Sequence, residues 1–189
     1  MGDPRRFKKK YTKPSHPWQK ERIDEEKALK KTFGLKNKKE IWKAGSLLRK
    51  FYRQSKKLVA LKTKQADKER IELLTRLTKL GLLKENAPLD AVLNITLNDM
   101  LNKRLQTIVY KKGLARTIGQ ARQLVIHEHI SIGEKKMTIP SYYVSLQEEP
   151  LVNFAPDSSF SNPEHPERNI STAPKKEKRE KKFERRRRR

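Results

Sequence analysis

Apolar residues recur at helical spacing within the first third of the chain and predict a long helix over about residues 37–61. One face of this helix carries small and apolar side chains, which are Ile41, Ala44, Leu48, Phe51, Ser55 and Leu58. Another face, called here the basic stripe, carries Lys39, Lys43, Ser46, Lys50, Arg53 and Lys57. Acids are nearly absent after Glu40, which favours a contact with a nucleic-acid backbone over an ordinary solvated face. Asn37 and Glu40 fit the N-cap and N3 positions of a capping box.

Three shorter helices are expected around this long one. Residues 21–31 carry opposite charges at helical spacing, and Gly34 ends that helix. After a break at 62–66, a helix over 67–83 has a stripe predicted to be core, made of Ile71, Leu74, Leu77 and Leu80. Residues 87–93 form a short helix with Pro88 at its first position.

Residues 97–152 predict a small folded unit. Its first helix buries Leu97, Leu101, Leu105 and Ile108 and is closed by Gly113. Thr96 is its expected N-cap, with Asp99 at N3. A second helix follows, and then strand-like runs at 130–132, 137–139 and 143–146, with a turn at 133–135. The predicted class is therefore α+β, with an N-terminal helical region packed on two short helices and a small, mostly antiparallel sheet.

The second helix of this unit has a polar edge. Thr117 and Gln120 form a capping box at its start. Arg116, Gln120, Gln123 and His127 share one face, and Arg122 flanks it. Because free amides and the helix dipole favour anions at a helix N-terminus, this face suits a phosphate.

Both ends of the sequence are basic. Residues 1–20 hold seven basic residues and one acid, and three prolines exclude a helix there. Such an arm can follow a phosphate backbone, with Phe7, Tyr11 or Trp18 stacking on bases. Residues 153–173 resemble a linker without a core. Residues 174–189 carry eleven basic residues and three acids, which fits an RNA-threading extension, a short helix or a nuclear-localisation signal.

Composition sets the class of partner. The chain has 47 Lys+Arg against 22 Asp+Glu, a net charge of +25, and this excess opposes compaction unless a polyanion neutralises it. Nucleic acid is the first candidate and an anionic membrane surface the second. No apolar run approaches the ~20 residues that span a bilayer, and no signal peptide is expected.

No chemistry of catalysis is predicted. Cysteine is absent, which excludes disulfides and cysteine zinc sites. His127 and His129 have no third ligand nearby, so neither a metal nor a cofactor is expected. No phosphate loop, nucleophilic triad or carboxylate pair stands out, and the chain is predicted not to be an enzyme.

Several of these motifs carry a resemblance. Residues 104–105, 115–117, 120–124, 127, 130–132 and 139–142 resemble the RNA-binding domain named after small-subunit ribosomal protein four. Residues 4–6, 17–18, 21–23, 33–42 and 104–107 are similar to the archaeal and eukaryotic form of that family, so the resemblance covers about residues 3–152. Bacterial members often carry a cysteine zinc knuckle, which this chain lacks. The hairpin has Gly133-Glu134-Lys135 where many modules have Asn-Gly.

The resemblance implies a structural protein of the small ribosomal subunit in the cytoplasm. It implies an early-binding rRNA protein that nucleates assembly of the subunit body, lies near the mRNA entry side and contributes to translational accuracy. Its partners would be 16S-type rRNA, neighbouring small-subunit proteins and mRNA near the entry channel, with no membrane. The expected domains are a basic arm (1–20), a helical rRNA-binding domain (21–96), an RNA-binding module (97–152), and a linker with a basic tail (153–189).

Two sources give the predicted RNA-binding residues. The resemblance assigns an RNA-facing role to Arg104, Arg116, Thr117, Gln120, Arg122, His127, Ser141 and Tyr142. The arm, the helical region and the second-helix face add Arg5, Arg6, Lys8, Lys9, Lys10, Trp18, Arg22, Lys36, Asn37, Lys38, Lys39, Lys43, Lys50, Arg53, Lys57 and Gln123. Two other classes remain open at this stage: an RNA-modifying enzyme or stalled-ribosome rescue factor that uses the same module, and a general DNA-compacting protein.

Overall fold

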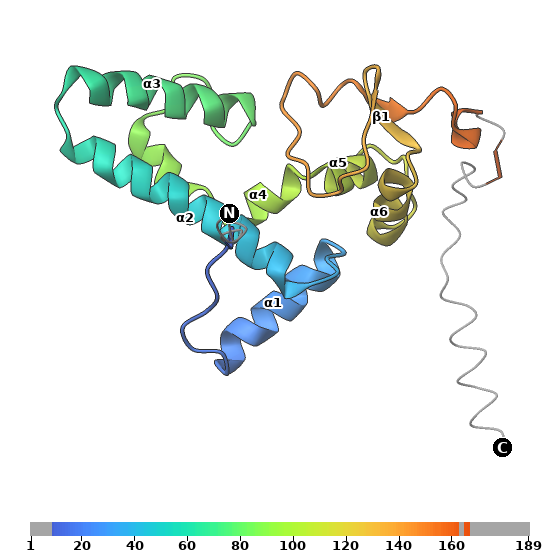
Figure 1. Ribbon diagram of the computed structural model, residues 1–189, viewed down its shortest axis with the longest axis horizontal. Helices are drawn as coiled ribbons and strands as arrows, with labels where there is room; N and C mark the ends of the chain where they lie inside the picture. The colour runs from blue at the N-terminus through green and yellow to red at the C-terminus, as the bar shows by residue number, and fades with distance from the viewer. Residues whose placement is uncertain (1–8, 163–164, 167–189) are drawn as a thin grey trace, which may run out of the picture.

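The structure, a computed structural model, describes residues 9–162 and 165–166. Figure 1 shows the long helix α2 (Lys38–Ala60), with α1 (Lys20–Thr32) at its N-terminal end and α3 (Lys64–Lys79) folded back along it. The C-terminal module, residues 103–161, lies beside the N-terminal half of α2. The predicted RNA-binding residues Arg5, Arg6 and Lys8, and the basic run 174–189, lie outside the described residues.

Helix α2 confirms the predicted periodicity. It begins after the N-cap Asn37, ends before Leu61, and buries all six residues of the predicted apolar face. Phe51 is 1% exposed and packs in the core shared with α3 and the 3-10 helix η1 (Leu89–Asn94). The predicted capping box at its start is wrong, because the Asn37 side chain makes no cap hydrogen bond and the Glu40 carboxylate binds arginines instead.

The buried face of α3 differs from the predicted stripe. The helix begins at Lys64, where the Thr63 hydroxyl accepts a hydrogen bond from the Ala66 amide. It buries Ala66, Leu73 and Leu77, while Ile71 is 66% exposed. Leucines occur on two adjacent faces of this helix, and contact with α2 determines which of them is buried.

The single helix predicted from Leu97 is two helices, α4 (Leu97–Asn102) and α5 (Leu105–Lys111). Thr96 and Asp99 form a reciprocal capping box, which confirms the predicted N-cap. The break falls at Arg104, whose backbone is extended. There the Leu105 amide donates to the Tyr142 carbonyl at 2.8 Å and the Gln106 amide to the Pro140 carbonyl at 3.3 Å, in place of helical acceptors.

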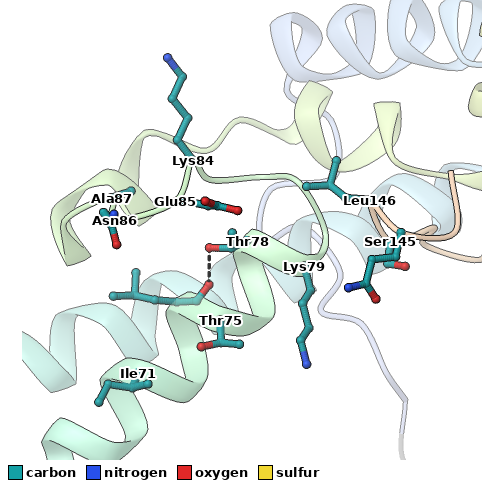
Figure 2. A pocket seen from close by; sticks show the side chains of 12 residues that line it. Ile71, Thr75, Thr78, Lys79, Lys84, Glu85, Asn86, Ala87, Ser145 and Leu146 are labelled. Atoms are coloured by element: carbon teal, nitrogen blue, oxygen red, sulfur yellow. Dashed lines mark hydrogen bonds between the residues drawn. The ribbon is translucent and has the colours of Figure 1, made fainter. Parts of the chain in front are cut away.

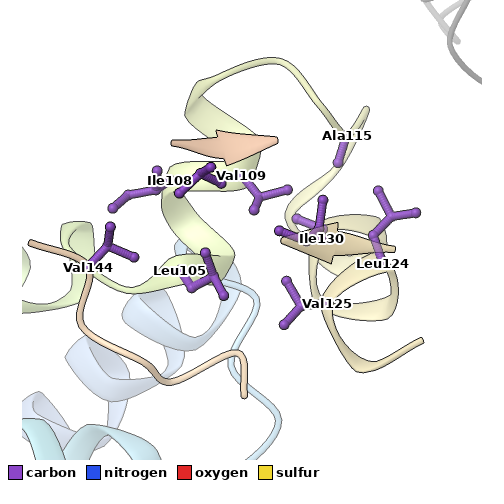
Figure 3. Packing of buried hydrophobic residues seen from close by; sticks show 10 residues of the cluster. Leu105, Ile108, Val109, Ala115, Leu124, Val125, Ile130 and Val144 are labelled. Atoms are coloured by element: carbon purple, nitrogen blue, oxygen red, sulfur yellow. The ribbon is translucent and has the colours of Figure 1, made fainter. Parts of the chain in front are cut away.

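The module contains α5, α6 (Ile118–Ile126) and an antiparallel sheet of order β2-β1-β3. The strands are β1 (Ile130–Ile132), β2 (Lys135–Lys136) and β3 (Val152–Phe154). Figure 3 shows the module's core, in which Leu105, Val125 and Ile130 meet between the helices and the sheet. The α+β class is therefore confirmed.

Three details of the predicted sheet are wrong. The returning strand is β2, earlier than the predicted 137–139, with Gly133 at φ +59° in the turn. Residues 143–146 form no strand, and only an isolated bridge joins Tyr143 to Arg104. The third strand is β3. Val152 in it is buried and Asn153 is exposed.

The expectation of a coreless linker from residue 153 is also wrong for its first part. Ala155 is 1% exposed, and Phe154 and Phe160 pack against the module core. The folded module therefore extends to the short 3-10 helix η2 (Ser159–Ser161).

The corrected face of α3 gives a test of the fold. Leu77→Ala should lower the free energy of unfolding by about 2–5 kcal/mol, because Leu77 is fully buried. Ile71→Ala on the same helix should change it by less than about 0.5 kcal/mol. Urea denaturation of both variants measures this, and equal losses would contradict the observed orientation of α3.

Candidate nucleic-acid interface

The helical region and the module meet at one carboxylate, Glu40 in the first turn of α2. It accepts a hydrogen bond from Arg104 at 2.6 Å, and its two oxygens are bound by Arg122 at 2.9 and 3.2 Å. The Arg104 side chain is 3% exposed. A bidentate arginine–carboxylate pair fixes orientation as well as distance, so this cluster sets how α2 lies against α5 and α6.

Gln106 extends this contact to the turn after α1. It is 1% exposed, and its side-chain amide donates to the carbonyls of Gly34 at 3.2 Å and Ile118 at 3.0 Å. Gly34 has φ +56°, and a Cβ there would lie 2.5 Å from the Ile118 side chain. Only glycine therefore allows this close approach between the turn and α6.

The ionisation of Glu40 follows from its partners. Burial opposes the charge, but the hydrogen bonds from Arg122 and Arg104 outweigh it and hold the pKa of this carboxyl below its ordinary value. The cluster therefore carries one negative and two positive charges near neutral pH.

A second buried carboxylate, Glu26 of α1, holds two of the predicted RNA-binding cations. It is bound by Arg22 at 2.6 Å and Lys38 at 3.0 Å, and it accepts from the Trp42 indole at 2.9 Å. Burial opposes its ionisation, but these three hydrogen bonds keep the pKa of Glu26 below its ordinary value. Arg22, Lys38 and Arg104 are thus all engaged in ion pairs within the protein.

The basic stripe is open to solvent. Its cations, Lys39, Lys43, Lys50, Arg53 and Lys57, are all exposed, and none forms an ion pair with any residue that the structure describes. The Ser46 hydroxyl accepts a hydrogen bond from the Thr12 amide at 3.0 Å, so the basic arm contacts the stripe at its one uncharged residue. Lys9, Lys10, Lys36 and Asn37 are exposed near it, and Trp18 is 89% exposed.

The predicted edge of α6 forms as expected at its start. The Thr117 hydroxyl accepts from the Gln120 amide at 3.1 Å, which confirms the N-cap. The Gln120 side chain accepts from the Arg116 amide at 2.8 Å, one residue before the position that a capping box requires. Arg116, Gln123 and His127 are exposed along this edge, and the Arg116 guanidinium donates to the Pro166 carbonyl at 3.1 Å.

The two residues predicted from the loop between β2 and β3 differ in how far their side chains are exposed. Ser141 is exposed. Tyr142 is half-buried, and its hydroxyl donates to the Glu148 carboxylate at 2.9 Å. This hydrogen bond raises the pKa of Tyr142. The backbone amide of Ser145, with a smaller contribution from Tyr142, holds the pKa of Glu148 below its ordinary value. Tyr142 therefore supports the loop whose backbone carbonyls accept hydrogen bonds from the start of α5.

A cleft of about 520 Å³ lies where the helical region meets the module. It is lined by Lys10, Asn37, Lys39, Glu40, Lys43, Leu47, Arg104, Arg122, Pro140, Ser141 and Tyr143. Seven of these eleven are predicted RNA-binding residues, namely Lys10, Asn37, Lys39, Lys43, Arg104, Arg122 and Ser141. The fold thus brings together cations that are far apart in the sequence.

A second groove, of about 630 Å³, lies between the C-terminal end of α3 and two loops (Figure 2). Its lining includes Ile71, Lys84 and Leu146, and the Thr78 hydroxyl on its wall donates to the Leu74 carbonyl. None of the predicted RNA-binding residues lines it. It is therefore separate from the candidate interface.

The histidines and helices of the described part of the chain form neither a metal site nor a membrane span. There, no three residues of metal-binding type lie close enough to hold an ion. His129 bonds Ser158 at 2.9 Å, and burial, together with the neighbouring His127, lowers the pKa of His129. Within the same residues, every helix is too short or too polar to cross a membrane.

The exposed stripe, the capped edge of α6 and the cleft between them define a nucleic-acid-binding protein. Residues 103–149 match the S4 domain. The small ribosomal subunit protein uS4 of Methanococcus aeolicus is 48% identical over 172 residues, covering 90% of this chain and 97% of that protein. Its namesake in Ignicoccus hospitalis is 50% identical over 160 residues, covering 85% and 96% respectively. The chain belongs to the family of small ribosomal subunit protein uS4, which is structural and not enzymatic.

The Glu40 cluster predicts a pH-dependent stability. Glu40→Gln should lower the free energy of unfolding by about 3 kcal/mol at neutral pH, because it leaves the buried Arg104 charge without its partner. Since the folded-state pKa of Glu40 is lowered, its contribution is present above the ordinary carboxyl value near ~4.3 and is lost as pH falls through the lowered pKa.

Urea titrations of wild type and variant across this range measure the effect, with Glu134→Gln in the exposed hairpin turn as the control. The Glu40→Gln deficit should shrink in acid, and the control should show none. A pH-independent deficit would show that the charge of Glu40 is not what stabilises the interface.

Proposed function

We propose that this protein is a structural constituent of the small ribosomal subunit that binds rRNA through one surface made by two parts of its fold. The surface comprises the basic stripe of α2, the polar edge of α6, and the cleft between them. The arm, with Lys9, Lys10 and Trp18, and the residues Arg5, Arg6 and Lys8, would extend it. The relatives' name and the S4 domain support this assignment.

The observation that carries the proposal is the distribution of charge at the cleft. Its lining holds five cations and one carboxylate. They come from the arm and α2 on one side and from the module on the other. A rigid concave basic surface suits folded RNA, whose phosphates crowd where helices meet, and its affinity rests on neutralising several phosphates at once. Duplex DNA needs no such concavity, which makes general DNA compaction the weaker alternative.

The finer role follows from the family resemblance. The protein would bind early to 16S-type rRNA and nucleate assembly of the subunit body. It would lie near the mRNA entry side, contribute to translational accuracy, and contact neighbouring ribosomal proteins and mRNA. This role belongs to the ribosome of the cytoplasm, and it needs no cofactor and no metal.

The predicted residues divide into two roles. Those with exposed side chains are the proposed RNA contacts: Lys36, Asn37, Lys39, Lys43, Lys50, Arg53, Lys57, Arg116, Thr117, Gln123, His127 and Ser141. Gln120 shapes the helix start that presents them. Arg22, Lys38, Arg104 and Tyr142 act mainly by holding the surface in shape, because their charged or hydroxyl groups bind carboxylates of the protein.

The stripe gives a direct test. Wild-type protein should prefer small-subunit rRNA over tRNA and over duplex DNA, and its affinity should fall steeply with salt. Replacing both Lys50 and Arg53 with Gln should reduce the slope of log affinity against log salt by about 1 for each lost phosphate contact. Filter binding across salt concentrations measures this. Equal affinity for all three nucleic acids would reject the proposal.

Arg116, just before α6, and Arg122 within it give a second test, since they differ in their partners. Arg116→Ala should weaken rRNA binding by about 1–3 kcal/mol and lower the free energy of unfolding less than Arg122→Ala does. Arg122→Ala should lower both quantities, because Arg122 also binds Glu40. Binding and denaturation of both variants measure this, and unchanged affinity in both would remove α6 from the interface.

A further inference from the structure

We propose that the cleft between α2 and the module takes a single unstacked nucleotide of the bound RNA. This inference deepens the proposed function and rests on it for the identity of the RNA. The cleft would recognise one base by its shape and its hydrogen-bonding groups. The stripe residues outside the cleft would contact only the charged RNA backbone.

The size and position of the cleft favour a nucleotide over a duplex. Its volume of about 520 Å³ falls in the range of pockets that enclose small molecules. Its walls come from α2 and from the loop at Pro140–Tyr143, which the backbone bonds to Leu105 and Gln106 hold in place. In an RNA duplex the bases are paired and stacked inside the helix, so only an unstacked base can enter such a space.

The lining offers a separate group for each part of a nucleotide. Lys39 and Lys43 are exposed and unpaired among the described residues, and they suit the phosphate. The Asn37 side chain is not used for capping, and the Ser141 hydroxyl is exposed, so both can hydrogen-bond a base edge. Tyr143 supplies an aromatic ring, and unstacked bases commonly stack on such rings.

The single carboxylate of the lining does not oppose an anion. Both oxygens of Glu40 are occupied by Arg104 and Arg122, so its charge is neutralised locally. The same bonds fix the separation of the two walls. The cleft is therefore formed before RNA arrives, and a preformed site loses less entropy on binding.

The test uses the full chain and two probes with the same number of phosphates, a short oligouridine single strand and a blunt-ended RNA duplex. In NMR titrations, the resonances of Asn37, Ser141 and Tyr143 should shift with the single strand and not with the duplex. Equal shifts with both probes, or shifts confined to Lys50, Arg53 and Lys57, which belong to the stripe but do not line the cleft, would overturn the proposal in favour of backbone contact alone.

A steric variant makes the test independent of charge. Ser141→Phe fills the cleft, whereas Thr138→Phe places the same ring at an exposed residue of the same loop that does not line the cleft. Ser141→Phe should weaken oligouridine binding by roughly tenfold, the worth of one stacked base, while Thr138→Phe should not. The amide spectrum of each variant verifies its fold.

These outcomes are separate from those of the proposed function. Oligouridine carries no rRNA structure, so its binding in the cleft can be lost while rRNA preference persists. Equal oligouridine affinity in folded Ser141→Phe and Thr138→Phe would overturn the nucleotide site. A wild-type chain without rRNA preference would instead overturn the ribosomal role.

Discussion

The carboxylate of Glu40 is the interaction on which the arrangement of this protein depends. It is held by arginines 64 and 82 residues further along the chain, Arg104 at the N-cap of α5 and Arg122 within α6. A buried ion pair of this kind adds little net stability compared with apolar packing, but it fixes geometry. Gln106 and Gly34 extend the contact between the helical region and the module.

The distribution of acids explains how so basic a chain folds. The chain has 22 acids against 47 Lys and Arg, fewer than half as many acids as cations. Glu26 and Glu40 are placed inside, where each neutralises two cations that lie between elements. The stripe cations remain outside and exposed. The ion pairs of Glu26 and Glu40 therefore hold the helices in place, and the exposed cations of the stripe are available to bind nucleic acid.

The features correctly predicted from the sequence are those that depend on residues close together in the chain. The buried face of α2 and the caps at Thr96 and Thr117 were correct, because they depend on residues within a few turns. The break at Arg104 was missed, since the acceptors that replace the helical ones belong to the distant loop at Pro140 and Tyr142. The predicted buried face of α3 was wrong at Ile71, which is exposed, but correct at Leu77, because contact with α2 selects which apolar residues of α3 are buried.

The candidate site was predicted in part. The exposed stripe and the α6 edge were identified from charge and spacing, and Lys39 and Lys43 of the stripe, with Arg122 beside the edge, line one cleft. The sequence did not show that Arg104 and Arg122 share a carboxylate. The available signal was Glu40 itself, an isolated acid at the start of a basic helix, which was interpreted as a cap.

The central claim is that α2 and α6 present one rigid surface to one region of rRNA. Because the chain has no cysteine, a single cysteine introduced at Lys57 or at Gln123 can carry a tethered iron chelate that cleaves nearby RNA. The account predicts that chelates at both positions cleave the same rRNA junction, each at its own fixed sites. In Glu40→Gln, the cleavage sites from one position should broaden or move relative to those from the other. Cleavage of unrelated regions, or a pattern unaffected by Glu40→Gln, would contradict it.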